Sequence, residues 1–186
     1  METIAFFFET EEQVRAEVTR RIKTLGRQGK PREAVQQLAE MAKVGVQPDT
    51  LAGTALLDAC ARCGKLNMMQ AVFDELFANG DMLRPDDVTF AVLIRGYGSA
   101  DPPKWSAISA VLNRLEGQYG APSVAVFNAL LEVCARTNDE DRAGEVLARM
   151  EAAGVLPNEQ TYEALSKRKS LRSMLKRTFG GAQAHL

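Results

Sequence analysis

Residues with the chemistry for nucleophilic catalysis or metal binding are few in this sequence. Its single histidine is His185, one residue from the carboxyl end, and its cysteines are Cys60, Cys63 and Cys134. A Ser-His-Asp or Cys-His catalytic unit would therefore have to be built on a terminal tail. Cys60 and Cys63 have the spacing of a metal or redox pair, but a zinc site needs four ligands, and the sequence has no second cysteine pair or histidine cluster. We expect no catalytic residue, no metal and no cofactor.

A second group of polar side chains recurs along the chain at a nearly constant interval. A small polar residue follows each of four prolines, at Asp49, Asp86, Ser123 and Asn158. Hydroxyl and amide groups donate and accept hydrogen bonds, and carboxylates accept them, so each copy carries a group able to make a directional contact. The prolines, at 48, 85, 122 and 157, are 37, 37 and 35 residues apart. A period of this size indicates a repeat protein.

Other residue types follow the same register. An aromatic residue lies five positions after three of the prolines, at Phe90, Phe127 and Tyr162. Cys60 falls twelve positions after its proline, in register with Tyr97 and Cys134, so we interpret it as a core residue rather than a ligand. A glycine precedes each proline, at Gly45, Gly80, Gly120 and Gly154.

Each copy has the pattern of two helices joined by a turn. In the last full copy, apolar residues recur with helical spacing over 124–136 and again over 140–153, and Asp139 can cap the second helix. Gly154 lies where a left-handed residue ends that helix, and Pro157 prevents its continuation. The same pattern predicts helices over 51–62, 66–79, 88–98 and 105–118.

One hairpin of this size cannot bury its apolar face alone, so neighbouring hairpins must stack. We predict an all-α, right-handed α-solenoid of about four helix-turn-helix repeats with a C-terminal capping helix. The predicted repeats are 15–49, 50–86, 87–123 and 124–158, with a partial copy at 159–166. Residues 1–14 are expected to form an N-terminal leader or capping segment, and residues 167–186 a basic C-terminal helix and tail.

The net charge hides an uneven distribution. The chain has 23 Lys and Arg against 24 Asp and Glu, a formal charge of −1, which taken alone argues against a nucleic-acid-binding protein. Residues 15–49 and 159–186 each carry four positive charges in excess, whereas the segments between them range from −3 to 0. Two basic ends favour a polyanion. No apolar run approaches the roughly 18 residues of a membrane helix, so we expect no contact with a membrane.

The repeat unit resembles the pentatricopeptide repeat. That unit has 35 residues, ends in Gly-x-x-Pro-Asp/Asn and restarts with Thr-Tyr-Asn. Here the copy at 124–158 contains Val-Phe-Asn-Ala-Leu-Leu at 126–131 and ends in Gly-Val-Leu-Pro-Asn. The resemblance covers about 15–166, and the copies at 50–86 and 87–123 are each two residues longer. Tetratricopeptide repeats share the hairpin but have a 34-residue period and a Trp-x-x-Leu-Gly opening, which is absent here.

The resemblance implies binding of single-stranded RNA, with one base per hairpin. In the family, a base is read mainly by one residue of the first helix together with the residue after the proline. Thr with Asp at these positions indicates guanine, Asn with Asn indicates a pyrimidine, and an alanine offers no polar group for discrimination. The matching pairs are Thr19 with Asp49, Thr54 with Asp86, Ala91 with Ser123, and Asn128 with Asn158.

The resemblance also implies positions for stacking and for phosphate contacts. Family members sandwich each base between apolar residues at the starts of successive first helices, which here are Leu51, Val88 and Ala125, whereas Gln160 departs from that pattern. Basic residues later on the first helix can meet phosphate, and Ser99 interrupts this series. The phosphate contacts expected are Arg27, Arg62 and Arg136, with Lys167, Arg168 and Arg172 from the basic tail, for which a solvated cap is the alternative.

Family members often act in chloroplasts or mitochondria, so the resemblance implies one of these organelles, with a targeting peptide absent from this chain. We hypothesise a non-enzymatic protein that binds single-stranded RNA selectively in RNA processing, splicing or stability, with no small-molecule substrate. The alternative is a protein-interaction solenoid, acting as a scaffold or as a subunit of a ribonucleoprotein complex. Protein partners or a homodimer fit both hypotheses, and the sequence could also be a fragment of a longer repeat protein.

Overall fold

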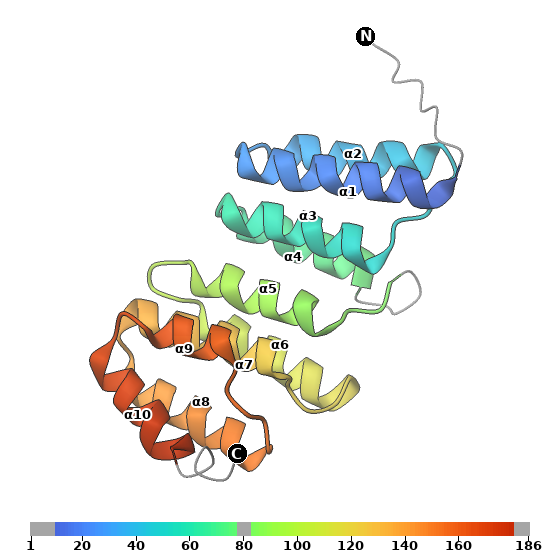
Figure 1. The fold of residues 1–186 in the computed structure, drawn as a ribbon. Coiled ribbons are helices and arrows are strands. Elements are labelled where there is room, and N and C mark those ends of the chain that lie inside the picture. The colour runs from blue at the N-terminus through green and yellow to red at the C-terminus, as the bar shows by residue number, and fades with distance from the viewer. Residues whose placement is uncertain (1–9, 78–82, 181–186) are drawn as a thin grey trace. The chain divides into compact units, whose positions relative to one another are not determined.

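Every secondary-structure element in the described part of the chain is an α-helix (Figure 1). The computed structural model describes residues 10–77 and 83–180, so Gly80, His185 and most of the leader predicted at 1–14 lie outside it. The chain divides into two compact units, Met1–Asp86 and Asp87–Leu186. Among the described helices, none has the length and the apolar character needed to cross a membrane.

The first unit consists of two helical hairpins, with α1 packed along α3. Its helices are α1 (Glu11–Arg27), α2 (Pro31–Lys43), α3 (Thr50–Arg62) and α4 (Leu66–Phe77). Helix α1 begins one turn before the predicted start of the first repeat, because the Thr10 hydroxyl accepts a hydrogen bond from the backbone N–H of Gln13 at 3.3 Å. Glu11 and Glu12 occupy the first turn, where the helix dipole favours negative charge. Residues 11–14 therefore extend the first hairpin.

The second unit contains three hairpins. Its helices are α5 (Asp87–Gly98), α6 (Trp105–Gln118), α7 (Val124–Thr137), α8 (Glu140–Ala152), α9 (Glu159–Leu165) and α10 (Lys169–Phe179). The first helices α5, α7 and α9 pack in sequence, and α10 packs on both α8 and α9. The C-terminal helix expected from the sequence is thus the second arm of a fifth, shorter hairpin. Leu171, Leu175 and Phe179 are its buried residues.

The helix ends follow the turn residues that the sequence indicated. Gly45, Gly120 and Gly154 have φ angles of 83°, 106° and 67°, in the left-handed region that only glycine adopts at no steric cost. Helix α8 begins at the predicted cap, where the Asp139 carboxylate accepts a hydrogen bond from the backbone N–H of Arg142 at 3.1 Å. This hydrogen bond holds the pKa of the Asp139 carboxyl below its ordinary value.

Most aromatic and cysteine positions of the repeat lie in the core. Phe90, Phe127, Cys60 and Cys134 are buried, whereas Tyr162 of the partial last copy is 38% exposed. Burial raises the pKa of the Cys60 thiol to about 11 and that of Cys134 to about 12. Cys60 therefore fills the core, as its register indicated. Within the described residues, no group of three or more His, Cys, Asp or Glu side chains could hold a metal ion.

The three thiols should differ in reactivity in the folded protein. Cys63 is half-buried, and its Sγ lies 3.7 Å from the carbonyl oxygen of Gly26, whereas Cys60 and Cys134 have raised pKa values in closed surroundings. We predict that a chromogenic disulfide reagent at about pH 8 labels Cys63 first, and the other two only after unfolding, since the thiolate is the reacting form. Cys63→Ser should remove the early phase of labelling. Early labelling of two or three thiols in the native protein would contradict this.

Close approach between successive first helices depends on small residues. An added Cβ on Gly98 of α5 would lie 2.1 Å from Cγ2 of Val133 on α7. In the first unit, an added Cβ on Gly26 of α1 would lie 2.7 Å from Cβ of Ala59 on α3. Both distances are shorter than carbon atoms tolerate, so glycine sets the separation of the helices at these two crossings.

Substitution of Gly98 tests this constraint. We predict that Gly98→Ala lowers the free energy of unfolding by about 1–3 kcal/mol, because overpacking of this contact forces the helices apart. Gly117→Ala is the matched control: this helical glycine has open space around its Cβ position, so alanine should be neutral or stabilise by up to about 1 kcal/mol. Urea denaturation measures both, and Val133→Ala should recover part of the loss in Gly98→Ala.

Candidate nucleic-acid interface

One face of each first helix carries the residues singled out from the sequence. In α7, this face contains Ala125, Asn128, Glu132 and Arg136, which are separated by three or four positions and so lie along one side of the helix. We call the equivalent residues of all four first helices the register stripe. The stripe contains Ala16, Thr19, Lys23 and Arg27 in α1; Leu51, Thr54, Asp58 and Arg62 in α3; Val88, Ala91, Arg95 and Ser99 at α5; and the four residues of α7.

Asn128 and Asn158, predicted to read one base together, are in direct contact. Nδ2 of Asn128 donates to Oδ1 of Asn158 at 3.0 Å. The hydroxyl of Thr161 on α9 donates to Oδ1 of Asn128 at 2.7 Å, and the backbone N–H of Thr161 donates to Oδ1 of Asn158 at 3.1 Å. Thr161 was not singled out from the sequence, although a polar residue three positions after Asn158 is the signal of a capping box.

These bonds fix the orientation of both amides. The backbone N–H of Thr161 can only donate, so the Asn158 atom it meets is the oxygen, and Asn128 must therefore present its NH₂ group to that oxygen. Asn128 is fully buried by the contact, whereas Asn158 is exposed. The Asn158 NH₂ group consequently faces outward as a hydrogen-bond donor, and Asn128 acts through it.

The third predicted pair lacks this arrangement. Ala91 offers no hydrogen-bonding side chain, and the Ser123 hydroxyl is buried without a hydrogen-bond partner within the described residues. Ser123 occupies the cap position of α7 but its side chain makes no capping bond. This pair therefore presents no oriented polar group.

In the first unit, the two predicted pairs divide between buried and accessible members. Thr19 and Thr54 are buried on α1 and α3. Asp49 is half-buried and caps α3 by accepting a hydrogen bond from the backbone N–H of Ala52 at 2.8 Å. Asp86 is exposed directly before α5. In all four pairs, then, the residue after the proline is the member more open to solvent.

Two of the three predicted stacking residues are exposed apolar side chains. Leu51 is 58% exposed and Val88 is 54% exposed, each in the first turn of its helix. Ala125 is half-buried, and Gln160 is exposed. Large apolar side chains at this exposure are available to a ligand surface, as base stacking requires.

Three of the arginines predicted to contact phosphate already form ion pairs or hydrogen bonds within the chain. Arg62 forms an ion pair with Asp58 at 2.6 Å. Arg136 donates to the carbonyl oxygens of Gly98, the last residue of α5, and of Ala100 just beyond it. Arg168 does the same for α7, through the carbonyl oxygen of Ala135 at 2.8 Å. The last two arginines stabilise the carbonyl ends of neighbouring helices.

The remaining predicted cations are more accessible. Arg27 is exposed, and its Nε lies 3.3 Å from the carbonyl oxygen of Lys23 one turn earlier. Lys167 and Arg172 are also exposed and, within the described residues, have no carboxylate partner. The same holds for three further cations of α10: Lys169, Lys176 and Arg177. The last hairpin thus carries more cations than its two acidic residues, Glu159 and Glu163, can neutralise.

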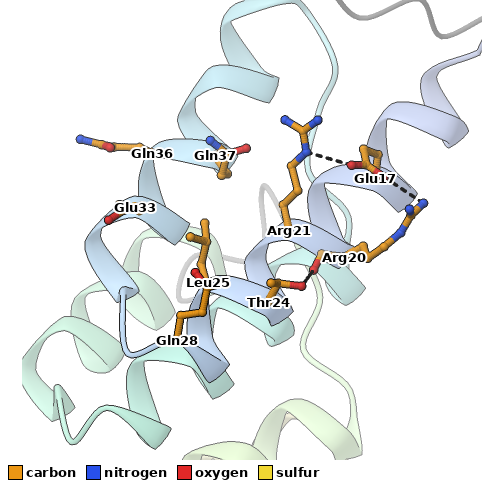
Figure 2. A pocket seen from close by; sticks show the side chains of 9 residues that line it. All are labelled: Glu17, Arg20, Arg21, Thr24, Leu25, Gln28, Glu33, Gln36 and Gln37. Atoms are coloured by element: carbon orange, nitrogen blue, oxygen red, sulfur yellow. Dashed lines mark hydrogen bonds and ion pairs between the residues drawn. The ribbon is translucent and has the colours of Figure 1, made fainter. Parts of the chain in front are cut away.

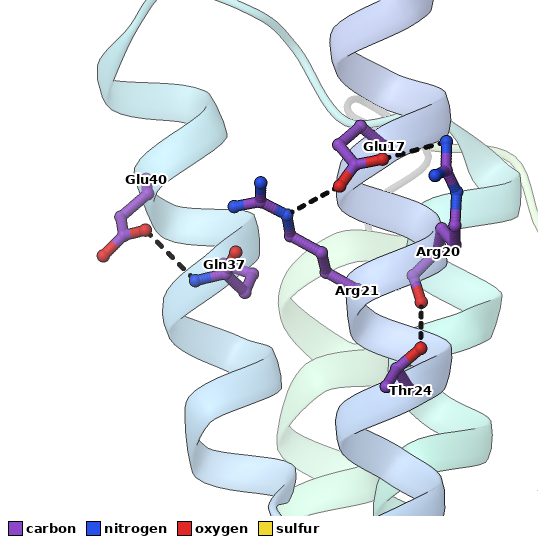
Figure 3. Close-up of polar contacts among 6 residues, drawn as sticks. All are labelled: Glu17, Arg20, Arg21, Thr24, Gln37 and Glu40. Carbon is purple, nitrogen blue, oxygen red and sulfur yellow. Dashed lines mark hydrogen bonds and ion pairs between the residues drawn. The ribbon is translucent and has the colours of Figure 1, made fainter. Parts of the chain in front are cut away.

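An open groove of about 450 Å³ lies between α1 and α2 (Figure 2). Within it, Glu17 pairs with both Arg20 and Arg21 at 2.9 Å, and the Thr24 hydroxyl donates to the carbonyl oxygen of Arg20 (Figure 3). In the next hairpin, small apolar residues occupy the places of Glu17, Arg20 and Thr24: they are Ala52, Ala55 and Ala59. The outer face of the first hairpin is therefore a solvated, internally paired surface, as in a capping repeat, and it does not gather donors around a ligand.

The repeats of this chain are similar to those of known proteins. The model of the pentatricopeptide repeat domain family matches residues 27–100 and 111–167. A pentatricopeptide repeat-containing protein of Arabidopsis thaliana is 30% identical over 130 residues, which are 69% of this chain and 22% of that protein. A second protein of that name from the same plant, described as mitochondrial, is 36% identical over 80 residues, 42% of this chain and 14% of its own length.

A solved structure shows the same fold. Maize PPR10, a pentatricopeptide repeat protein crystallised with an 18-nucleotide psaJ RNA element, matches with a TM-score of 0.73 and 26% identity over 91% of this chain. The match covers 26% of PPR10, so this chain spans only about a quarter of its length, and a smaller share of the curated relatives. The similarity and the hairpins of the structure confirm the predicted all-α solenoid of helix-turn-helix repeats.

The Asn128–Asn158–Thr161 network should stabilise the second unit. We predict that Thr161→Val lowers the free energy of unfolding by about 1–3 kcal/mol, because it leaves the buried Oδ1 of Asn128 without its donor. Thr137→Val is the control, since Thr137 is exposed and its hydroxyl bonds only to carbonyls of its own helix; it should change stability by less than about 0.5 kcal/mol. Equal effects of both substitutions in urea denaturation would show that the network contributes nothing.

Proposed function

This chain belongs to the pentatricopeptide repeat family, and from that premise we propose that it binds single-stranded RNA, with successive repeats reading successive bases. The observation that carries the proposal is the pairing of Asn128 with Asn158, at repeat positions that the sequence singles out for base reading. The pair leaves one oriented amide donor at the surface. The RNA-bound state of PPR10, which shares the fold, supports the same assignment.

Base reading is proposed to rest chiefly on the residue after each proline. The outward NH₂ group of Asn158 is suited to the acceptors of a pyrimidine edge, which are O2 and N3 in cytosine and O2 and O4 in uracil, and Asn128 holds it in place. Asp49 and Asp86, backed by Thr19 and Thr54, offer carboxylate acceptors, which match the N1–H and N2–H₂ donors of guanine. The Ala91 and Ser123 copy is expected to accept any base.

Stacking and phosphate contacts complete the proposed interface. Leu51 and Val88 are exposed apolar surfaces on which base faces can lie. Ala125 provides a smaller surface of the same kind. Among the cations, Arg27, Lys167 and Arg172 are the accessible candidates for phosphate, whereas Arg136 and Arg168 would have to leave helix-capping bonds to reach one. The structure thus shifts the proposed backbone contacts toward the last hairpin.

We propose a non-enzymatic role in the processing, splicing or stability of organellar RNA. The relative described as mitochondrial supports an organellar location, and a chloroplast fits the family equally well. The chain spans 22% and 14% of the length of its two plant relatives. The activity and the protein partners of the whole protein are therefore proposals as well. The rival function, a protein-interaction scaffold, is separated from this one by the binding experiment below.

The binding experiment uses labelled single-stranded RNAs of about ten nucleotides, one guanine-rich and one uridine-rich, at about 50 and 200 mM salt. We expect salt-sensitive binding that Asn158→Ala weakens by about tenfold for pyrimidine-containing RNA, since one base-edge contact is lost, and that Thr54→Ala weakens for guanine-rich RNA. Asn113→Ala, at an exposed site on the second helix α6, is the control and should leave affinity unchanged. Absence of binding to any RNA, or binding untouched by both substitutions, would favour the scaffold.

A further inference from the structure

The third place of the register stripe alternates in charge from repeat to repeat. Successive first helices carry Lys23, Asp58, Arg95 and Glu132 there, and Lys167 continues the series after α9. This place lies one turn beyond the base-reading residue on the same helix face, where an RNA backbone would pass if the proposed function holds. The carboxylates of Asp58 and Glu132 would repel a polyanion, so their presence on a surface proposed to bind RNA needs an explanation.

Glu132 forms a two-bond ion pair with the arginine of the preceding repeat. Nε of Arg95 lies 2.6 Å from Oε2 of Glu132, and Nη2 lies 3.0 Å from Oε1. The side chains are 40% and 38% exposed, so the pair is open to solvent. In the first unit, Asp58 pairs with Arg62 one turn later on the same helix through a single contact, with Oδ2 at 2.6 Å from Nε.

The geometry of the Arg95–Glu132 pair is that of a phosphate contact. A guanidinium presents parallel N–H groups that fit the paired oxygens of either a carboxylate or a phosphate. Glu132 therefore occupies the donors that Arg95 would otherwise offer to RNA, and Asp58 occupies those of Arg62. Because both pairs are exposed, an incoming phosphate can compete for the arginine without opening the core.

We propose that Glu132 and Asp58 act as phosphate mimics that hold Arg95 and Arg62 away from the RNA backbone until the bases are read. This inference rests on the proposed RNA binding and deepens it. RNA whose bases fit the repeats displaces the carboxylates, whereas RNA with the wrong sequence gains too little from its bases to do so. The carboxylates thus lower affinity for all RNA and raise the share of affinity that depends on sequence.

The last hairpin supplies the internal contrast. The exposed cations Lys167, Lys169 and Arg172 have no carboxylate partner among the described residues. These cations attract any polyanion, whereas Arg95 and Arg62 can bind a phosphate only if it displaces Glu132 or Asp58. Sequence-blind attraction therefore comes from the last hairpin and from the accessible Arg27 of the first repeat, whereas Arg62 and Arg95 meet phosphate only by exchange.

The test is Glu132→Gln in the same chain, measured with preferred and mismatched RNA over a series of salt concentrations. Freeing Arg95 should raise affinity for mismatched RNA by about three- to tenfold, and affinity for preferred RNA by less. The slope of log K against log salt should become more negative by about 0.7, the value for one added phosphate contact on a single strand. Asp58→Asn should act in the same direction through Arg62.

Glu116→Gln is the matched control. Glu116 pairs with Arg149 between the second helices α6 and α8, with side chains 38% and 48% exposed. The substitution therefore removes the same charge as Glu132→Gln, but from an inter-repeat pair away from the register stripe. It should leave the salt slope unchanged. In the double variant Arg95→Gln/Glu132→Gln, the added slope should disappear, because the released arginine is absent. Circular dichroism confirms that each variant is folded.

The outcomes separate the two proposals. If the unaltered chain binds no RNA, the proposed function fails, and the phosphate-mimic role with it. If that chain binds RNA but Glu132→Gln changes neither the salt slope nor the discrimination between RNAs, the mimic role is overturned and RNA binding stands. An equal gain from Glu116→Gln and Glu132→Gln would also overturn it, since the effect would then be one of net charge.

Discussion

The contact between successive first helices is the constraint on which the rest of each unit depends. A single hairpin leaves an apolar face uncovered, so it must be covered by the next. Gly98 against Val133, and Gly26 against Ala59, let the backbones approach so closely that a Cβ on either glycine would overlap its neighbour. In the second unit, the packing of α9 on α7 places Asn158 and Thr161 against Asn128, and thereby assembles that polar pair.

The same packing decides which polar groups a ligand can reach. Asn128 is buried against Asn158 and Thr161, so both groups of its amide are used in hydrogen bonds that orient Asn158. Residues after the prolines have a double use, because Asp49 and Asn158 also cap the helices that follow them. A capping oxygen is held by backbone N–H groups, and its side chain is therefore already ordered before any base arrives.

The charge that a ligand would meet depends more on how each arginine is paired than on the net charge of the chain. Arg62 and Arg95 are matched with carboxylates, and Arg136 and Arg168 with carbonyl oxygens at helix ends. A near-zero net charge is therefore compatible with a surface that meets phosphate, provided that the partners can exchange. The last hairpin carries unmatched positive charge, and it also closes the apolar core of the second unit through Leu171 and Leu175.

The sequence by itself determined the repeat, its period, the helix ends and the core. These are local properties: prolines, left-handed glycines, N-caps and apolar spacing act within a few residues, and so Trp105–Gln118 was predicted at both ends. It also predicted which residues pair for base reading, because a repeat register transfers from copy to copy. Tertiary structure alone decided that Thr161 orients Asn128, that Arg136 and Arg168 cap neighbouring helices, and that Glu132 holds Arg95. These contacts join residues more than 30 positions apart, and a small shift in helix packing changes which side chains meet.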